Sequence, residues 1–211
     1  MPCPQIMVSC PENCPAQNLK NLPNYGPQGT NWNNWVNYCE NLRRNECNLI
    51  LEKHGRIKLY ILTESIPNGR FVYDPQSNYR NNNGLRKQLC IVLINANYPP
   101  NINHCSQCPN FNMLLNYLRD KGILIVDCAL CPLHMLNRFS GRRHAATICL
   151  NNNTGIYLNV TPNAPIITIF PRNCGFLKTK KPHVQNRVIK ELSFSNLAGL
   201  KNAIEQILED P

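Results

Sequence analysis

Apolar positions form two kinds of pattern along this chain, continuous runs and repeats at helical spacing, and segments of the two kinds alternate. Continuous apolar runs predict buried strands at residues 58–62, 123–126, 165–170 and 188–192. Apolar residues at helical spacing predict one or two helices within residues 32–54, further helices at residues 85–93, 110–119 and 197–208, and another through Cys149 and Leu150. Strands that alternate with helices favour a parallel sheet. We therefore expect an α/β fold, a three-layer sandwich with a central, mainly parallel four-stranded sheet flanked by helices.

The chain is expected to form one domain preceded by an arm. Residues 1–30 are rich in Pro, Asn, Gln and Gly and show no sustained period, which predicts an irregular N-terminal arm. The α/β domain should then occupy residues 31–211, with a cysteine-containing loop insertion at residues 95–109. A chain of 211 residues that is 43% hydrophobic has enough apolar side chains for one substantial core.

Carboxylates stand directly after two of the predicted strands. The first strand leads into Thr63, Glu64 and Ser65, and the second delivers Asp127. In open α/β sheets, ligands bind outside the carboxyl ends of the strands, so the two carboxylates could face one crevice. The alternatives are that Glu64 is a solvated charge at a turn and that Asp127 organises its loop through backbone N–H groups.

Positive charge is in clear excess. The 22 Lys and Arg residues outnumber the 12 Asp and Glu residues, which gives a formal charge of +10 and favours a polyanionic partner, nucleic acid first. Lys178, Lys180 and Lys181 lie close to His183 and Arg187 and are suited to phosphate contacts. The alternative is that the excess charge only keeps the protein in solution.

The chain has no predicted membrane segment. No apolar run approaches the roughly 18 residues that a membrane span needs. The N-terminus also lacks a basic start followed by an apolar core, so we expect a soluble intracellular protein that is not secreted.

Twelve cysteines are many for such a protein. Without a signal segment, metal ligation or simple thiols are favoured over disulfides. Cys105 and Cys108, beside His104, form a CxxC pair that supplies two ligands of a zinc site, and Cys10 and Cys14 could complete it. The alternative for this pair is free thiols in a surface insertion.

From about residue 58 to the C-terminus, the order of elements and three loops resembles the uracil-DNA glycosylase superfamily. The sequence TESIP at residues 63–67 is similar to the first active-site motif, GEAPG in an iron–sulfur branch and ESPP in uncharacterised relatives. The sequence NGRFVY at residues 68–73 is similar to their GRYFY, and VDCALCP at residues 126–132 to the strand-end motif TNVVKCRPP. The sequence SFSN at residues 193–196 stands where the second active-site loop, often HPS, would lie.

The resemblance implies a site that removes a damaged or deaminated base from DNA. Glu64 would position water and stabilise the sugar cation, with Ser65 beside it and Asp127 reading the base. The remaining implied contacts are base binding by Phe71, Tyr73, Ser195 and Asn196, and DNA-backbone binding by Arg70, Lys178, Lys180 and Lys181.

The same resemblance suggests a metal cofactor. Cys131 and Cys149 stand at two of the four positions that hold the [4Fe–4S] cluster of the iron–sulfur branch, while Cys39 and Cys47 are too widely spaced for its early pair. A [4Fe–4S] cluster or zinc is thus one expectation, and scattered buried thiols are the other.

Three function classes remain open at this level. The first is a DNA glycosylase. The second is a catalytically inactive nucleic-acid-binding protein with the same fold, because Thr63 and Ile66 depart from the first motif and the second-loop His is absent. The third is a metal-stabilised interaction module built on the arm and the loop that contains Cys105 and Cys108.

Overall fold

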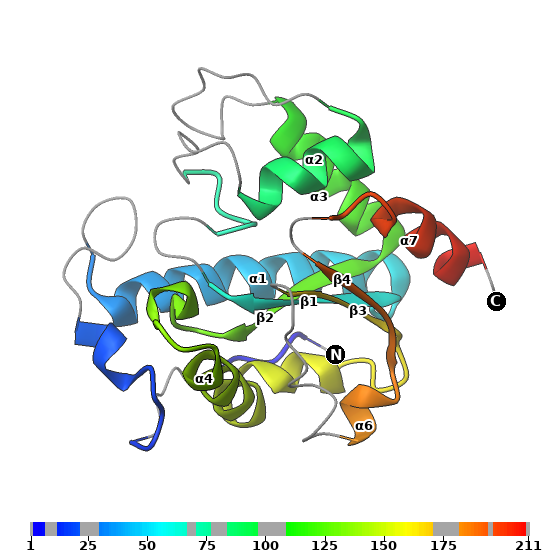
Figure 1. Ribbon diagram of the computed structural model, residues 1–211. Coiled ribbons are helices and arrows are strands. Elements are labelled where there is room, and N and C mark those ends of the chain that lie inside the picture. Colours follow the sequence, from blue (N-terminus) through cyan, green and yellow to red (C-terminus); the bar gives the residue numbers. More distant parts are fainter. Residues whose placement is uncertain are drawn as a thin grey trace.

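The strands form one parallel sheet. The computed structural model describes residues 2–6, 12–21, 30–66, 71–76, 84–96, 109–170, 182–193 and 196–209. Within them, β1 (Leu59–Ser65), β2 (Ile123–Ala129), β3 (Ile166–Phe170) and β4 (Val188–Ser193) pair in the order β2-β1-β3-β4, and every pairing is parallel (Figure 1). This arrangement confirms the α/β class and the four-stranded sheet that the sequence predicts.

Burial of the strands follows their place in the sheet. Every residue of β2 and β3 is buried, and so are the first five residues of β1. A parallel sheet covered by helices on both faces requires such continuous Ile, Leu and Val runs. β4 lies at one edge and is largely exposed, with half of the Ile189 side chain in solvent. The sheet core is therefore built mainly by β1, β2 and β3.

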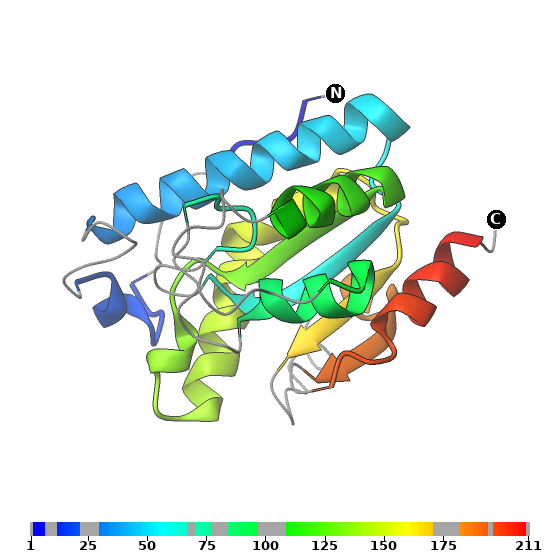
Figure 2. The ribbon, with the colours of Figure 1, turned by 90° about the horizontal axis from the view of Figure 1, so that it is seen from above.

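Helices cover the sheet on both faces and along one edge (Figures 1 and 2). One face is covered by α2 (Leu85–Ile94), α3 (Pro109–Lys121) and α7 (Leu200–Glu209). The other is covered by α4 (Phe139–Asn152), the short α6 (Pro182–Gln185) and the 3-10 helix η4 (Thr154–Asn159). The long helix α1 (Trp32–His54) runs along the β2 edge, and η1 (Gln17–Asn21) and η3 (Leu133–Met135) are short 3-10 helices. Among the described residues, no helix has the length and apolar character of a membrane span.

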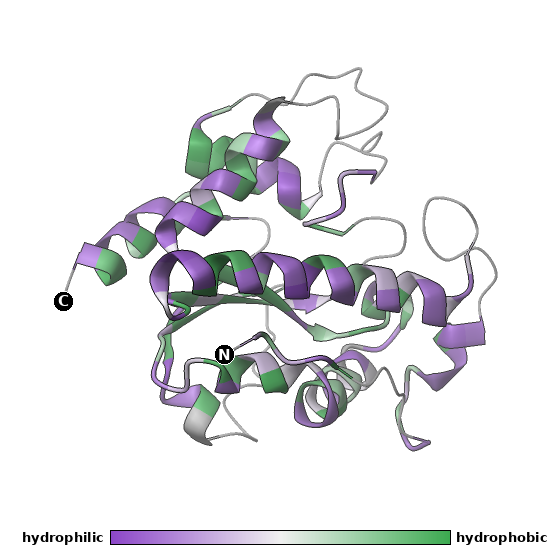
Figure 3. Cartoon of the chain, turned by 180° about the vertical axis from the view of Figure 1, so that it is seen from behind, coloured by the Kyte–Doolittle hydropathy of each residue, from purple (hydrophilic) through white to green (hydrophobic). Residues whose placement is uncertain are grey.

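Local signals fix where α1 begins and ends. The Asn31 side chain accepts a hydrogen bond from the Asn34 backbone N–H at 2.9 Å, which caps the first turn. Gly55 ends the helix with φ of 69°, and its N–H donates to the Leu51 carbonyl. Along the helix, polar and apolar residues alternate (Figure 3). The apolar ones face the core, as the periodic pattern from residue 32 to 54 predicts.

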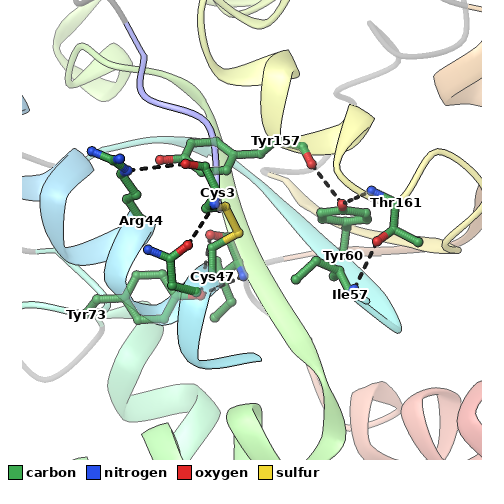
Figure 4. The surroundings of a disulfide bond; sticks show 10 residues. Cys3, Arg44, Cys47, Ile57, Tyr60, Tyr73, Tyr157 and Thr161 are labelled. Carbon is green, nitrogen blue, oxygen red and sulfur yellow. Dashed lines mark hydrogen bonds between the residues drawn. A yellow bond between two sulfur atoms is a disulfide. The ribbon is translucent and has the colours of Figure 1, made fainter. Parts of the chain in front are cut away.

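The N-terminal arm is bound to α1. Cys3 forms a disulfide with Cys47, the Cys3 N–H donates to the Asn48 side chain at 2.7 Å, and the Arg44 guanidinium donates to the Cys3 carbonyl (Figure 4). Cys3, Ile6, Ala16 and Leu19 of the arm are buried in the core. The expectation of thiols or metal ligands is therefore wrong for Cys3 and Cys47, because folding brings two residues 44 positions apart into contact.

Candidate functional site

Glu64 lies at the carboxyl end of the central strand β1 and is held by an arginine of α4. The Arg142 guanidinium donates to both carboxylate oxygens, with Nε to Oε1 at 2.8 Å and Nη2 to Oε2. Both side chains are mostly buried, with 13% of the Glu64 side chain and 14% of the Arg142 side chain exposed. A bidentate pair fixes the carboxylate in orientation as well as in charge. Glu64 is thus neither a solvated charge nor an unpartnered one.

Asp127 lies near the carboxyl end of β2, which continues to Ala129, and has different partners. It is only 4% exposed, its Oδ2 accepts from Nη2 of Arg43, and its Oδ1 accepts from the Thr63 hydroxyl at 2.5 Å. Arg43 comes from α1 and is completely buried. The alternative that Asp127 organises its loop through backbone N–H groups does not hold, since within the described residues both of its hydrogen-bond partners are side chains.

The two carboxylates point to opposite faces of the sheet. Thr63 is the residue that pairs with Asp127 across β1 and β2, and its side chain contacts Asp127 on the same face. Glu64 is the next residue, and successive side chains of a strand alternate between faces. Its partner Arg142 accordingly comes from the α4 layer. The expectation that both carboxylates face one crevice is therefore wrong.

Arg43 is the centre of a buried cluster. Its guanidinium binds Glu40 as well as Asp127, and it lies 5.0 Å from the ring centroid of Phe71 and 5.8 Å from that of Tyr157. Sequence reasoning did not single this residue out. The signal was present, however, because Arg43 falls on the stripe of α1 that also carries Cys39, Cys47 and Ile50, where a charge has no access to solvent and needs a buried partner.

Phe71 and Tyr73 belong to the core. Phe71 is 0% exposed and Tyr73 is 3% exposed, and their rings make an edge-on contact with centroids 5.5 Å apart. The Tyr73 hydroxyl accepts from the Ile125 N–H at 2.7 Å and donates to the Ile125 carbonyl at 3.4 Å, so it satisfies both backbone groups of Ile125 at the open edge of β2. Burial raises the pKa of Tyr73 above its ordinary value. Both rings are therefore core side chains, and neither is placed to stack on an extruded base.

Side chains of α1 and α2 form hydrogen bonds with the segment that contains these rings, residues 71–76. Arg86 of α2 donates to the carbonyls of Phe71 and Asp74, and its guanidinium lies over the Phe111 ring, 4.3 Å from the centroid. The Tyr38 hydroxyl of α1 donates to the Asp74 carboxylate at 2.8 Å. Burial and the Asp74 charge raise the pKa of Tyr38. Residues 71–76 are thus held in place between α1 and α2.

The other predicted contacts fall partly inside the described residues. Ser65 accepts a hydrogen bond from the Leu133 N–H at 3.3 Å. Asn196 is exposed just beyond β4, where its N–H donates to the Ser193 carbonyl at 2.8 Å. Ser195, Arg70, Lys178, Lys180 and Lys181 lie outside the described residues.

Arg187, which the sequence groups with these lysines, has a structural role. It donates to the carbonyls of Leu158, Thr161 and Ala164 at 2.8 to 3.1 Å and lies over the Tyr60 ring. Burial lowers the pKa of Arg187. Its guanidinium therefore joins η4 and the connection between η4 and β3 to the residue before β4, and the expectation of a phosphate contact does not fit those bonds.

The described cysteines do not gather into a metal site. Within the part of the chain that the structure describes, no three His, Cys, Asp or Glu side chains are placed to share a metal ion. Cys131 and Cys149 are buried, and the Cys149 sulfur accepts from the Leu130 N–H at 3.3 Å. Cys47 is engaged in the disulfide, and burial raises the pKa of Cys39 well above its ordinary value, which disfavours the thiolate that a metal requires. Cys10, Cys105 and Cys108 lie outside the described residues.

A groove of about 620 Å³ lies away from these residues, lined by the arm, the C-terminal part of α1 and η4. It contains none of the predicted site residues.

No family model, no curated protein and no solved structure matches this chain. The fold and the contacts around Glu64 are therefore the basis for any statement about function.

Proposed function

We propose that this protein binds DNA and hydrolyses the N-glycosidic bond of a damaged or deaminated base, with Glu64 as the catalytic carboxylate. The observation that carries the proposal is the position of Glu64. It ends a central strand of a parallel sheet, where ligands of such sheets bind, and Arg142 fixes its carboxylate with two hydrogen bonds. The sequence around it, TESIP, is similar to the first motif of the uracil-DNA glycosylase superfamily.

The reaction requires that Glu64 carries a negative charge and lies beside the sugar. Cleavage of the bond gives the sugar oxocarbenium character and leaves the base with negative charge. A carboxylate beside the sugar stabilises the cation and orients the water that attacks it. Arg142 would keep the carboxylate aimed while the base, extruded from the stack, binds nearby.

The part of the site that reads the base needs a different assignment from the one the sequence suggests. The Asp127 carboxylate is committed to Arg43 and Thr63, and the Phe71 ring is buried. Among the described residues, exposed Asn196 follows β4 at the carboxyl end of the parallel strands, the end at which Glu64 lies, with β3 between their two strands. An amide both donates and accepts, as recognition of a base edge requires, so Asn196 is the described candidate.

A base-release assay tests the proposal. Single- and double-stranded oligonucleotides that carry uracil, hypoxanthine or xanthine would be incubated with the protein, and abasic sites would then be cleaved with alkali. We expect release of at least one base, loss of release in Glu64→Gln, and unchanged release in Glu52→Gln, which removes an exposed carboxylate near the end of α1. Equal activity of the two variants would remove Glu64 from the mechanism.

A second candidate is a nucleic-acid-binding protein without catalysis. It is favoured by the closed state of the site, since Phe71 has no exposed surface and both strand-end carboxylates are already paired with arginines. Salt-sensitive binding of oligonucleotides without release of any base in the panel would select this candidate.

A further inference from the structure

The positive charge of the chain is concentrated in one continuous segment. Residues 128–190 contain nine Lys and Arg and not a single Asp or Glu. The rest of the chain contains thirteen Lys and Arg and twelve Asp and Glu. Nine of the ten surplus positive charges therefore lie within residues 128–190.

The described part of this segment, residues 128–170 and 182–190, comprises η3, α4, η4, β3, α6 and the first half of β4. Its helices cover the same face of the sheet, at the bottom of Figure 1. Residues 133–152, which contain η3 and α4, are here called the α4 surface. Ala145, Ala146 and Leu150 turn inward to the core. The exposed basic residues of the α4 surface are His134, Arg138, Arg143 and His144.

Glu64 lies at the border of this surface. Arg142 turns inward to bind it, whereas Arg143, the next residue, and Arg138, one helical turn earlier, remain exposed. Neither exposed arginine forms a salt bridge within the described residues. A polyanion bound to Arg138 and Arg143 would pass directly beside the Glu64–Arg142 pair.

We infer that the α4 surface binds the phosphate backbone of a nucleic acid, with Arg138 and Arg143 as phosphate contacts. The inference rests on the proposed nucleic-acid partner and specifies where that partner binds. Arginine is suited to this role because its planar guanidinium donates to phosphate oxygens in pairs. An anionic membrane is the less suitable partner, because a helix that lies in a membrane surface presents apolar residues outward. The outward residues of α4 are polar, among them Ser140, Arg143, His144 and Asn151.

The test compares two double variants that lose the same charge. Arg138→Ala/Arg143→Ala removes two exposed arginines from the α4 surface, and Lys53→Ala/Arg56→Ala removes two exposed cations from the opposite, amino end of the strands. Binding of a short DNA duplex and of the corresponding single strand would be measured by fluorescence anisotropy across a range of salt concentrations. Circular dichroism would establish that both variants are folded.

The logarithm of the binding constant falls linearly with the logarithm of salt concentration, by about 0.9 per neutralised phosphate on duplex DNA. We expect Arg138→Ala/Arg143→Ala to reduce this slope by about two on the duplex, while Lys53→Ala/Arg56→Ala keeps the wild-type slope. Equal slopes in the two variants would overturn the inference. So would co-sedimentation of the wild type with phosphatidylserine vesicles in the absence of oligonucleotide binding.

The result of this binding test can be distinguished from the result of the base-release assay that tests the catalytic proposal. A reduced slope without base release in the wild type would support this binding surface and refute the glycosylase. Base release with an unchanged slope in Arg138→Ala/Arg143→Ala would support the glycosylase and place its DNA on another surface.

Discussion

Glu64 and Asp127 lie near the carboxyl ends of neighbouring strands, yet their carboxylates point to opposite faces and bind different arginines. Arg142 reaches Glu64 from α4, and Arg43 reaches Asp127 from α1. The alternation of side chains along a strand is sufficient to separate them, because Thr63, not Glu64, shares a face with Asp127. Each pair can therefore be tested by itself.

The Glu64–Arg142 pair should show coupling. Both side chains are largely removed from solvent, so removing one partner leaves a buried charge unpaired. We expect Glu64→Gln and Arg142→Met, each measured by urea unfolding, to have a coupling free energy of about 1–3 kcal/mol in a double-mutant cycle. The exposed pair of Lys53 and Asp120 serves as the control and should couple by less than about 1 kcal/mol. Additive effects of Glu64→Gln and Arg142→Met would contradict the pairing.

Asp127 should contribute to stability more than its place at a strand end suggests. Its removal in Asp127→Ala leaves Arg43 with Glu40 as its remaining carboxylate partner in a fully buried position. Loss of one partner of a buried ion pair costs about 3–5 kcal/mol, and we expect a value toward the lower end because Glu40 remains. Thr63→Val removes only the hydroxyl that donates to Asp127 and should cost about 1 kcal/mol. Urea unfolding of the two variants provides both values.

Phe71 should behave as a core residue. Phe71→Ala opens a cavity at a position with no exposed surface and should lower the free energy of unfolding by about 3–5 kcal/mol. Phe71→Leu keeps most of the volume and should cost distinctly less, with oligonucleotide binding unchanged. A base-stacking residue would give the opposite result: a small effect on unfolding and a large loss of nucleic-acid affinity.

The disulfide between Cys3 and Cys47 should stabilise the fold. It links residues 44 positions apart, and a cross-link over that distance reduces the entropy of the unfolded chain by an amount worth about 4 kcal/mol. A dithiol reductant should therefore lower the midpoint of thermal unfolding in the wild type. Cys3→Ser should start from the lower midpoint and show no further change with reductant. If the reductant leaves the midpoint of thermal unfolding of the wild type unchanged, the disulfide does not form.

Stability should decrease at alkaline pH, in part through Tyr60. Burial raises the pKa of Tyr60 from its ordinary value of 10.0 to about 12. Above about pH 10 the unfolded chain loses this proton while the folded protein retains it, so the free energy of unfolding falls until about pH 12. The contribution is on the order of 3 kcal/mol.

Tyr60→Phe separates this effect from the effects of other tyrosines. The variant loses the hydrogen bonds to the Tyr157 carbonyl and from the Thr161 N–H, so it should be less stable at neutral pH. Its stability should nevertheless fall less steeply than that of the wild type between about pH 10 and pH 12. Urea unfolding across this pH range measures both slopes, and identical slopes would contradict the role of Tyr60.

The sequence by itself determined the strands of the sheet, the main helices and the fold class. The predicted strand at residues 123–126 is the core of β2, and the predicted helix at residues 110–119 is the centre of α3. These elements were predictable because hydrophobic period is a local property, and four apolar runs separated by helices leave a covered parallel sheet as the favoured arrangement. The place of Glu64 near the carboxyl end of β1 followed from the same pattern, whereas β2 continues to Ala129, so Asp127 lies inside the strand and not directly after it.

Only the tertiary structure decided what those side chains contact. The partners Arg43 and Arg142 lie 84 and 78 residues away from Asp127 and Glu64, and Cys47 lies 44 residues from Cys3. Motif position suggested Phe71 as a base-stacking ring, but it is fully buried, beside Arg43 of α1 and with its carbonyl bound by Arg86 of α2. The local sequence pattern shows which residues are apolar or charged. The partner of a buried charge depends on how distant parts of the chain pack together, and no single stretch of sequence contains that information.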